Sequence, residues 1–203
     1  MKKSLTVLIG IILSLFLNAQ ENAKCKEVGL TFYNLDNFGM TFKIGSTNSL
    51  WRINSFLVNG INQKYDQDSS SRSSNVLRFD IKFGREFRKS IKDNFEFRYG
   101  VDLSFQYSKV KTEVDDISVR NYEYSNESLT FEPGINVILG FNYLINENLI
   151  LGAEYLPGIN YVFGYNSSKR NDGIEPIESK HDNSGINYGL QSGAALLSLS
   201  YRF

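Results

Sequence analysis

The residue types best suited to catalysis lie near the C-terminus, around the only histidine of the chain. His181 is followed by Asp182 and then by Ser184, the three residue types of a serine hydrolase. Such a hydrolase needs its base beside its nucleophile in the fold, and closeness along a polar segment does not supply that geometry. The single cysteine, Cys25, cannot form an intrachain disulfide or, with one His, a Cys/His zinc site. The sequence therefore predicts no catalytic residue, no metal site, no cofactor and an exposed Cys25 without a role.

Charged residues suggest a second kind of chemistry, because six basic and six acidic side chains share one face of the predicted strands. They are Lys43, Arg52, Arg78, Lys82, Arg98 and Arg202 with Asp80, Glu86, Glu96, Asp102, Glu132 and Glu154. Buried charges persist only when they are paired and hydrogen-bonded, and equal numbers allow complete pairing. The favoured interpretation is a salt-bridged structural core, and the alternative is an ion path or an acid–base site.

Length and composition limit the classes of protein that could carry these residues. A chain of 203 residues forms one domain or two small ones. The 22 basic residues balance the 22 acidic ones, so the clustered basic surface that nucleic acid requires is not expected. The 15 Phe, 12 Tyr and 16 Gly against 3 Pro favour strands and turns over helices.

The N-terminus has the three-part pattern of a secretory signal peptide. Two lysines follow the initiating Met, Leu5–Leu17 is mostly apolar, and Ala19 provides a small residue for cleavage. The apolar run is too short to span a bilayer as a helix, and a buried N-terminal helix is the alternative. A lipoprotein acylated at Cys25 is disfavoured because Lys24 precedes it. We expect residues 1–19 to be a signal peptide and residues 20–203 to be one β-barrel domain.

The rest of the chain alternates between apolar and polar residues with a period of two. In Phe95–Ser108 every odd position from Phe95 to Tyr107 is apolar or aromatic, while Glu96, Arg98 and Asp102 lie on the opposite face. A helix cannot produce this alternation. The strand is also longer than the ~5–6 residues usual in globular proteins and suits the ~9–11 residues of a membrane-spanning strand.

Eight such strands are predicted. They span 27–33, 37–45, 50–59, 76–87, 95–108, 128–145, 149–165 and 186–203. From the third strand onward, long polar connections (60–75, 109–127, 166–185) alternate with short ones (88–94, 146–148), and 46–49 is also short. Long loops at one end and tight turns at the other are typical of bacterial outer-membrane barrels. The sequence therefore predicts an all-β fold, an eight-stranded antiparallel up-and-down transmembrane β-barrel.

The aromatic face of these strands is predicted to contact lipid. Five aromatic side chains from Phe95–Tyr107 would not fit inside an eight-stranded barrel. Residues such as Trp51, Tyr107 and Tyr143 lie near strand ends, where aromatic girdles form. The charged face must then line the interior.

One short motif occurs twice, as Pro133-Gly134-Ile135-Asn136 and as Pro157-Gly158-Ile159-Asn160. Because the copies fall on successive antiparallel strands, we do not expect them to form one repeated surface. The favoured interpretation is a kink or β-bulge in each strand.

These features and the C-terminal Leu199-Ser200-Tyr201-Arg202-Phe203 resemble the small outer-membrane β-barrel superfamily, which includes the outer membrane protein A transmembrane domain and opacity-type proteins. The resemblance implies that Tyr201 and Phe203 form an assembly signal for the barrel-assembly machinery. Lys43-Ile44-Gly45, leading to Leu50-Trp51-Arg52-Ile53-Asn54, is similar to small barrels of Bacteroides-type bacteria.

The function expected from these features is a structural or surface-interacting role in the outer membrane. The partners would be outer-membrane lipids, the assembly machinery and an extracellular ligand held by the loops 60–75, 109–127 and 166–185, with no nucleic acid. Tyr122 and Tyr124 in the second loop could anchor a contact. The alternative is a narrow channel for small solutes. A lipid A-modifying enzyme is third, since the known palmitoyltransferase and deacylase barrels resemble this chain in fold class only.

Overall fold

The computed structural model describes residues 25–32, 38–56, 61–67, 70–116, 122–171, 175–189 and 195–203. The predicted signal peptide, residues 1–19, lies outside these ranges. Among the described residues, no helix is long and apolar enough to cross a membrane.

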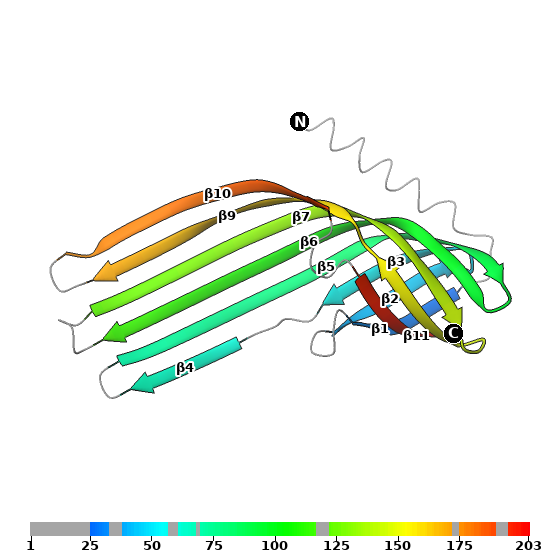
Figure 1. Cartoon of the computed structure of the whole chain (residues 1–203), viewed down its shortest axis with the longest axis horizontal. Coiled ribbons are helices and arrows are strands. Elements are labelled where there is room, and N and C mark those ends of the chain that lie inside the picture. The colour runs from blue at the N-terminus through cyan, green and yellow to red at the C-terminus, as the bar shows by residue number, and fades with distance from the viewer. Residues whose placement is uncertain are drawn as a thin grey trace.

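Eight antiparallel strands close into a ring (Figure 1). In ring order they are β7 (Tyr122–Leu144), β6 (Phe95–Asp116), β5 (Ser70–Lys92), β3 (Ser49–Phe56), β2 (Phe38–Ser46), β1 (Cys25–Phe32), β11 (Ala195–Arg202) and β8 (Leu149–Tyr155). Pairing of β8 with β7 completes the ring. The predicted all-β antiparallel barrel is therefore confirmed.

Burial alternates along the ring strands, as the sequence pattern requires. In β2 and β11 every second residue is buried over three repeats, and the residues between them are exposed. The exposed set is mostly apolar and the buried set is mostly small or polar: Leu103 is 57% exposed whereas its neighbour Asp102 is fully buried. An apolar exterior around a polar interior is the arrangement of a membrane barrel.

The three regions predicted as long loops are mostly strand, which corrects that prediction. They contain β4 (Ile61–Gln67), the upper part of β9 (Gly158–Asn171), most of β10 (Ile177–Gly189) and the upper ends of β5, β6 and β7. Both faces of these segments are mostly polar, so no clear apolar–polar alternation marks them as strands. The two C-terminal strands predicted as 149–165 and 186–203 are each divided, into β8 with β9 and β10 with β11.

Three ring strands, β5, β6 and β7, continue past the ring and pair with β4, β9 and β10, which lie outside it. Together they form one open six-stranded sheet, which we call the extension. Its order is β4-β5-β6-β7-β9-β10, and Figure 1 shows it projecting to one side of the ring with β4 and β10 at its edges. β1 and β2 do not contribute, since their hairpin register ends at Phe32 and Phe38.

The opposite end of the ring carries tight turns. Residues 47–48 and 93–94 are two-residue turns, and 145–148 join β7 to β8. The predicted turn 88–94 is too long, because β5 continues to Lys92. Arg88 is buried like Glu86, two residues before it, so the alternation of inward and outward side chains continues past residue 87.

Candidate functional site

The centre of the barrel is occupied by the guanidinium of Arg52, which is 1% exposed. Its Nε donates to Oδ1 of Asp102 at 2.9 Å, and its Nη1 lies 2.6 Å from Oε2 of Glu154 and 3.3 Å from Oε2 of Glu86. These partners come from β6, β8 and β5, so one side chain from β3 links strands on different sides of the ring.

Two more cations complete this central layer. Nζ of Lys43 lies 2.8 Å from Oε2 of Glu86, and Nη2 of Arg98 lies 3.1 Å from Oε2 of Glu154. Each of these four side chains is buried. The Lys43–Glu86 contact is a charge-assisted hydrogen bond, among the stronger ones available in proteins. Arg98 and Glu154 form an ion pair without a hydrogen bond between them.

A second layer lies nearer the tight turns and is centred on Arg88. Its two terminal nitrogens each lie 2.7 Å from a carboxylate oxygen of Glu27, a bidentate pair, and its Nε donates to Glu86 at 2.7 Å. Arg202 adds a 2.8 Å contact to Glu27 and a 3.5 Å contact to Glu96.

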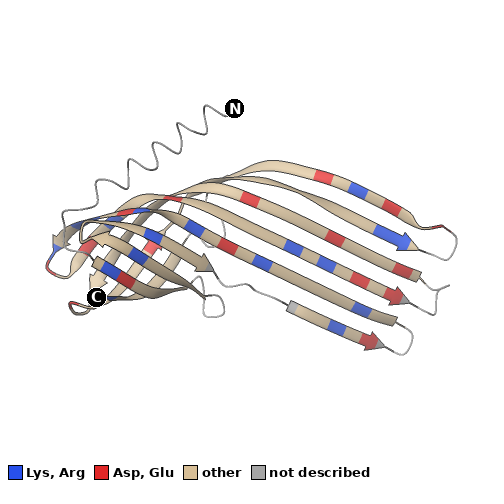
Figure 2. Cartoon of the chain, turned by 180° about the vertical axis from the view of Figure 1, so that it is seen from behind, with Lys and Arg blue, Asp and Glu red and all other residues tan. Residues whose placement is uncertain are grey.

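The two layers form one connected set of ion pairs, which we call the lumen network. It comprises Lys43, Arg52, Arg88, Arg98 and Arg202 with Glu27, Glu86, Glu96, Asp102 and Glu154. Five cations face five carboxylates, so the network is formally neutral. Figure 2 shows acidic and basic positions close together on the ring strands near the C-terminus.

The remaining sequence-predicted charges lie apart from the network. Lys82 pairs with Asp80 further up β5. Arg78 is exposed on the extension, and Glu132 is half-buried on β7. Both residues occupy alternate strand positions that point to the inner side, but they lie above the region where the ring is closed. An inward-pointing position therefore does not by itself imply burial.

Sequence analysis missed Glu27 and Arg88, although both were detectable. Glu27 precedes Val28 and Leu30, whose outward phase places it inside. Arg88 is two residues beyond Glu86 and was lost because the strand was predicted to end at 87. Glu27 could have been assigned as the first inward position of the predicted strand 27–33, and Arg88 would have been found by extending the strand 76–87 by one residue.

The repeated Pro-Gly-Ile-Asn motif pairs with itself, which corrects the expectation that the copies share no surface. Gly134 lies opposite Asn160, Ile135 opposite Ile159, and Asn136 opposite Gly158. A Cβ at Gly134 would overlap the side chain of Asn160, and one at Gly158 would overlap that of Asn136. Each glycine therefore makes room for the partner motif's asparagine. The predicted kink occurs at Leu156-Pro157, between β8 and β9, whereas β7 runs through Pro133 without a break.

An aromatic and cationic girdle surrounds the end of the ring with the tight turns. The guanidinium of Arg85 lies 5.3 Å from the ring centres of both Trp51 and Phe87. Phe203 stacks on Tyr201 at 6.4 Å, and its backbone exchanges hydrogen bonds with Lys26 at 2.9 and 3.2 Å. The side chain of Phe203 is exposed. Such rings mark a membrane–water interface.

The candidate hydrolase residues do not assemble into a triad. His181 lies on β10 beside Ser179, 3.0 Å from its hydroxyl oxygen, while Asp182 and Ser184 point to the other face of the strand.

Cys25 is buried, which corrects its expected exposure. It points to the inside of the ring as Glu27 does, and its Sγ lies 4.0 Å from the Glu27 carboxylate. Within the described part of the chain, no group of three or more His, Cys, Asp or Glu side chains could hold a metal ion.

A closed antiparallel ring with a lipid-facing apolar exterior defines an outer-membrane β-barrel protein. Residues 64–188, more than half of the chain, match the model described as "Putative OmpA-OmpF-like porin family". The chain belongs to this family. The narrower resemblance to Bacteroides-type barrels stays a prediction.

Solved structures with weak similarity are also outer-membrane proteins. A major outer membrane protein from Thermus thermophilus is 12% identical, with 90% of this chain and 100% of that chain covered and a TM-score of 0.35. CarO from Acinetobacter baumannii is 10% identical, with 92% and 99% covered and a TM-score of 0.34. A comparison with curated proteins finds no match.

Proposed function

We propose that this protein is a closed outer-membrane barrel that holds the extension at the cell surface. It would be exported by cleavage near Ala19 and oriented with its tight turns in the periplasm, as in other barrels of this type. The proposal includes no catalytic step.

The observation that carries this proposal is the burial of the lumen network. Arg52, Arg98, Glu86 and Asp102 are each at most 1% exposed, although they lie where a pore would run. An eight-stranded interior is just wide enough for side chains to fill it. Ion pairs that reach from β3 to β6 and β8 support the proposal that no continuous water column passes through the ring.

The direct test is a planar-bilayer recording of the purified protein. We expect little or no steady conductance, because an ion would have to separate buried pairs in order to pass. A known general porin, reconstituted in parallel, is the control that must show openings. Large and stable openings of this protein would instead support a narrow channel for small solutes. That role would agree with the word porin in the family's description.

A second prediction concerns assembly through the C-terminus. Deleting Phe203 should lower the amount of barrel in the outer membrane several-fold, since we propose that Tyr201 and Phe203 are recognised by the assembly machinery. Refolding into detergent should change little, because the deletion removes only an exposed ring stacked on Tyr201 and two backbone hydrogen bonds at the strand end. Phe203→Trp, which keeps a terminal aromatic, is the matched control. Equal outer-membrane levels of all three proteins, measured by immunoblotting, would show that no such signal is used.

A further inference from the structure

The inner face of the extension, which continues the lumen-facing side of the strands, carries an ordered set of side chains. Near the tips, one residue from each of the six strands forms a row of direct cross-strand partners, which we call the tip row. It consists of Tyr65, Arg72, Val114, Tyr124, Arg170 and Ile177. Tyrosine and arginine thus recur across the sheet, at right angles to the strands.

The next row on the same face is uniformly polar. This polar row consists of Gln63, Ser74, Thr112, Asn126, Ser168 and Ser179. All six side chains are hydroxyls or amides, which can both donate and accept hydrogen bonds. None carries a charge, so the two rows together offer cations and rings beside neutral hydrogen-bonding groups.

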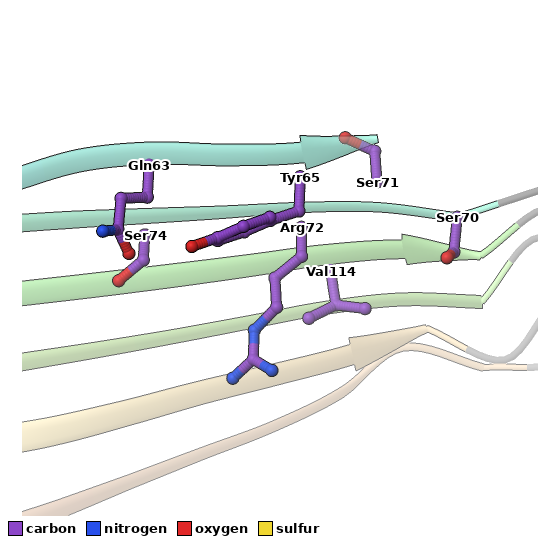
Figure 3. Close-up of a pocket in the computed structure, with 7 residues that line it drawn as sticks. All are labelled: Gln63, Tyr65, Ser70, Ser71, Arg72, Ser74 and Val114. Atoms are coloured by element: carbon purple, nitrogen blue, oxygen red, sulfur yellow. The ribbon is translucent and has the colours of Figure 1, made fainter. Parts of the chain in front are cut away.

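The two rows meet in a cavity of about 560 Å³ at the β4–β6 side of the extension. Gln63, Tyr65, Arg72, Ser74 and Val114 line it, with Ser70 and Ser71 at its end. In the close-up, Tyr65 and Arg72 reach over the face from neighbouring strands, close to Gln63 and Ser74 (Figure 3). The cavity therefore combines one ring, one guanidinium and several neutral polar groups.

Two lysines on the outer face of the extension and Arg72 on its inner face differ in their ion-pair partners. The two lysines on the outer face are paired with acids: Lys64 with Asp66 at 3.1 Å, and Lys169 with Glu178 at 3.2 Å. Among the described side chains, Arg72 has no acidic partner within ion-pair distance. At the far side of the tip row, Arg170 lies 5.5 Å from the ring of Tyr122. The exposed guanidinium of Arg72 therefore presents a positive charge on the inner face to an external anion.

We propose that the tip row and the polar row bind an acidic polysaccharide that lies across the strands. This inference rests on the proposed function, because it requires the extension to be displayed outside the membrane. Guanidinium groups bind carboxylates and sulfates in bidentate geometry. Tyrosine rings present an apolar surface with a polar end, which suits the faces and hydroxyls of a sugar ring. Six strands spaced ~4.8 Å apart give a track of roughly 24 Å, long enough for a chain of several sugars.

The test is binding of defined polymers to the full-length protein in detergent, measured by microscale thermophoresis. The probes are polygalacturonate (carboxylated), heparin (sulfated), dextran (neutral) and polyglutamate (acidic but without sugar). We expect one or both acidic polysaccharides to bind at least about tenfold more tightly than dextran and polyglutamate, a difference of ~1.4 kcal/mol. Equal binding of polyglutamate would overturn the assignment to a sugar, and equal binding of dextran would overturn the role of charge.

Variants in one hairpin locate the site. Arg72→Ala should weaken binding about tenfold, Arg72→Lys should weaken it less, and Tyr65→Ala should also reduce it. Lys64→Ala lies in the same hairpin on the outer face and should bind like the wild type. An equal loss in Lys64→Ala, or no loss in Arg72→Ala, would overturn the proposal. The heat-dependent gel mobility of each variant checks that the barrel is folded, and failure to bind sugar would leave the conductance test of the closed barrel unaffected.

Discussion

Replacing Arg52 with Met is expected to lower the free energy of unfolding by about 3–5 kcal/mol. The substitution keeps an unbranched side chain but removes the charge that faces Asp102, Glu154 and Glu86. Asp102 is fully buried and Arg52 is its one ion-pair partner among the described residues, so its carboxylate would be left uncompensated. Urea unfolding from lipid vesicles, followed by circular dichroism, measures the change.

Two controls separate this effect from a general sensitivity to lost ion pairs. Lys64→Ala removes an exposed pair, with Asp66, and should cost at most about 1 kcal/mol. Adding Asp102→Asn to Arg52→Met should recover part of the loss, because one uncompensated charge disappears. A loss in Arg52→Met as small as that in Lys64→Ala would mean that water reaches the network, and the closed-core interpretation would fail.

The membrane-spanning part of the fold could be predicted because its two faces meet different solvents. Along β6 the lipid-facing positions are apolar and the inward ones polar from Phe95 to Ser108, so the period of two is visible in the sequence. Above Ser108 the same strand continues to Asp116 with water on both sides, and the periodicity disappears. The extension was therefore mistaken for loops, although hydrogen-bonded pairing continues unbroken.

The lumen network could be predicted only as a set of inward charges. The period of two along a strand assigns each residue to the inner or the outer face. It does not say which strands lie opposite each other across the ring. The contact of Arg52 with Glu154 joins residues 102 positions apart and depends on closure of the ring through β8. The tip row was similarly hidden. Tyr124 and Arg170 become neighbours only through the register of β7 and β9.

The second large effect should come from placing a charge on the lipid-facing surface. Leu103→Arg is expected to lower the free energy of unfolding by about 2–4 kcal/mol, the cost of an arginine near the bilayer midplane. Leu103 is exposed on the ring exterior, and its cross-strand neighbours Phe83 and Ile135 are also apolar and exposed, so neither offers a polar group to receive the guanidinium. Fluorescence of the only tryptophan, Trp51, reports unfolding in lipid vesicles.

Matched variants on the same strand show whether the cost comes from lipid. Leu103→Met changes shape without charge and should cost less than about 1.5 kcal/mol. Val110→Arg places the same charge on the inner face of the extension, where water is available, and should be close to neutral. If Leu103→Arg were as stable as Val110→Arg, the apolar face of the ring would not contact lipid. The inside-out arrangement, and with it the placement of the lumen network at the centre of a membrane barrel, would then have to be abandoned.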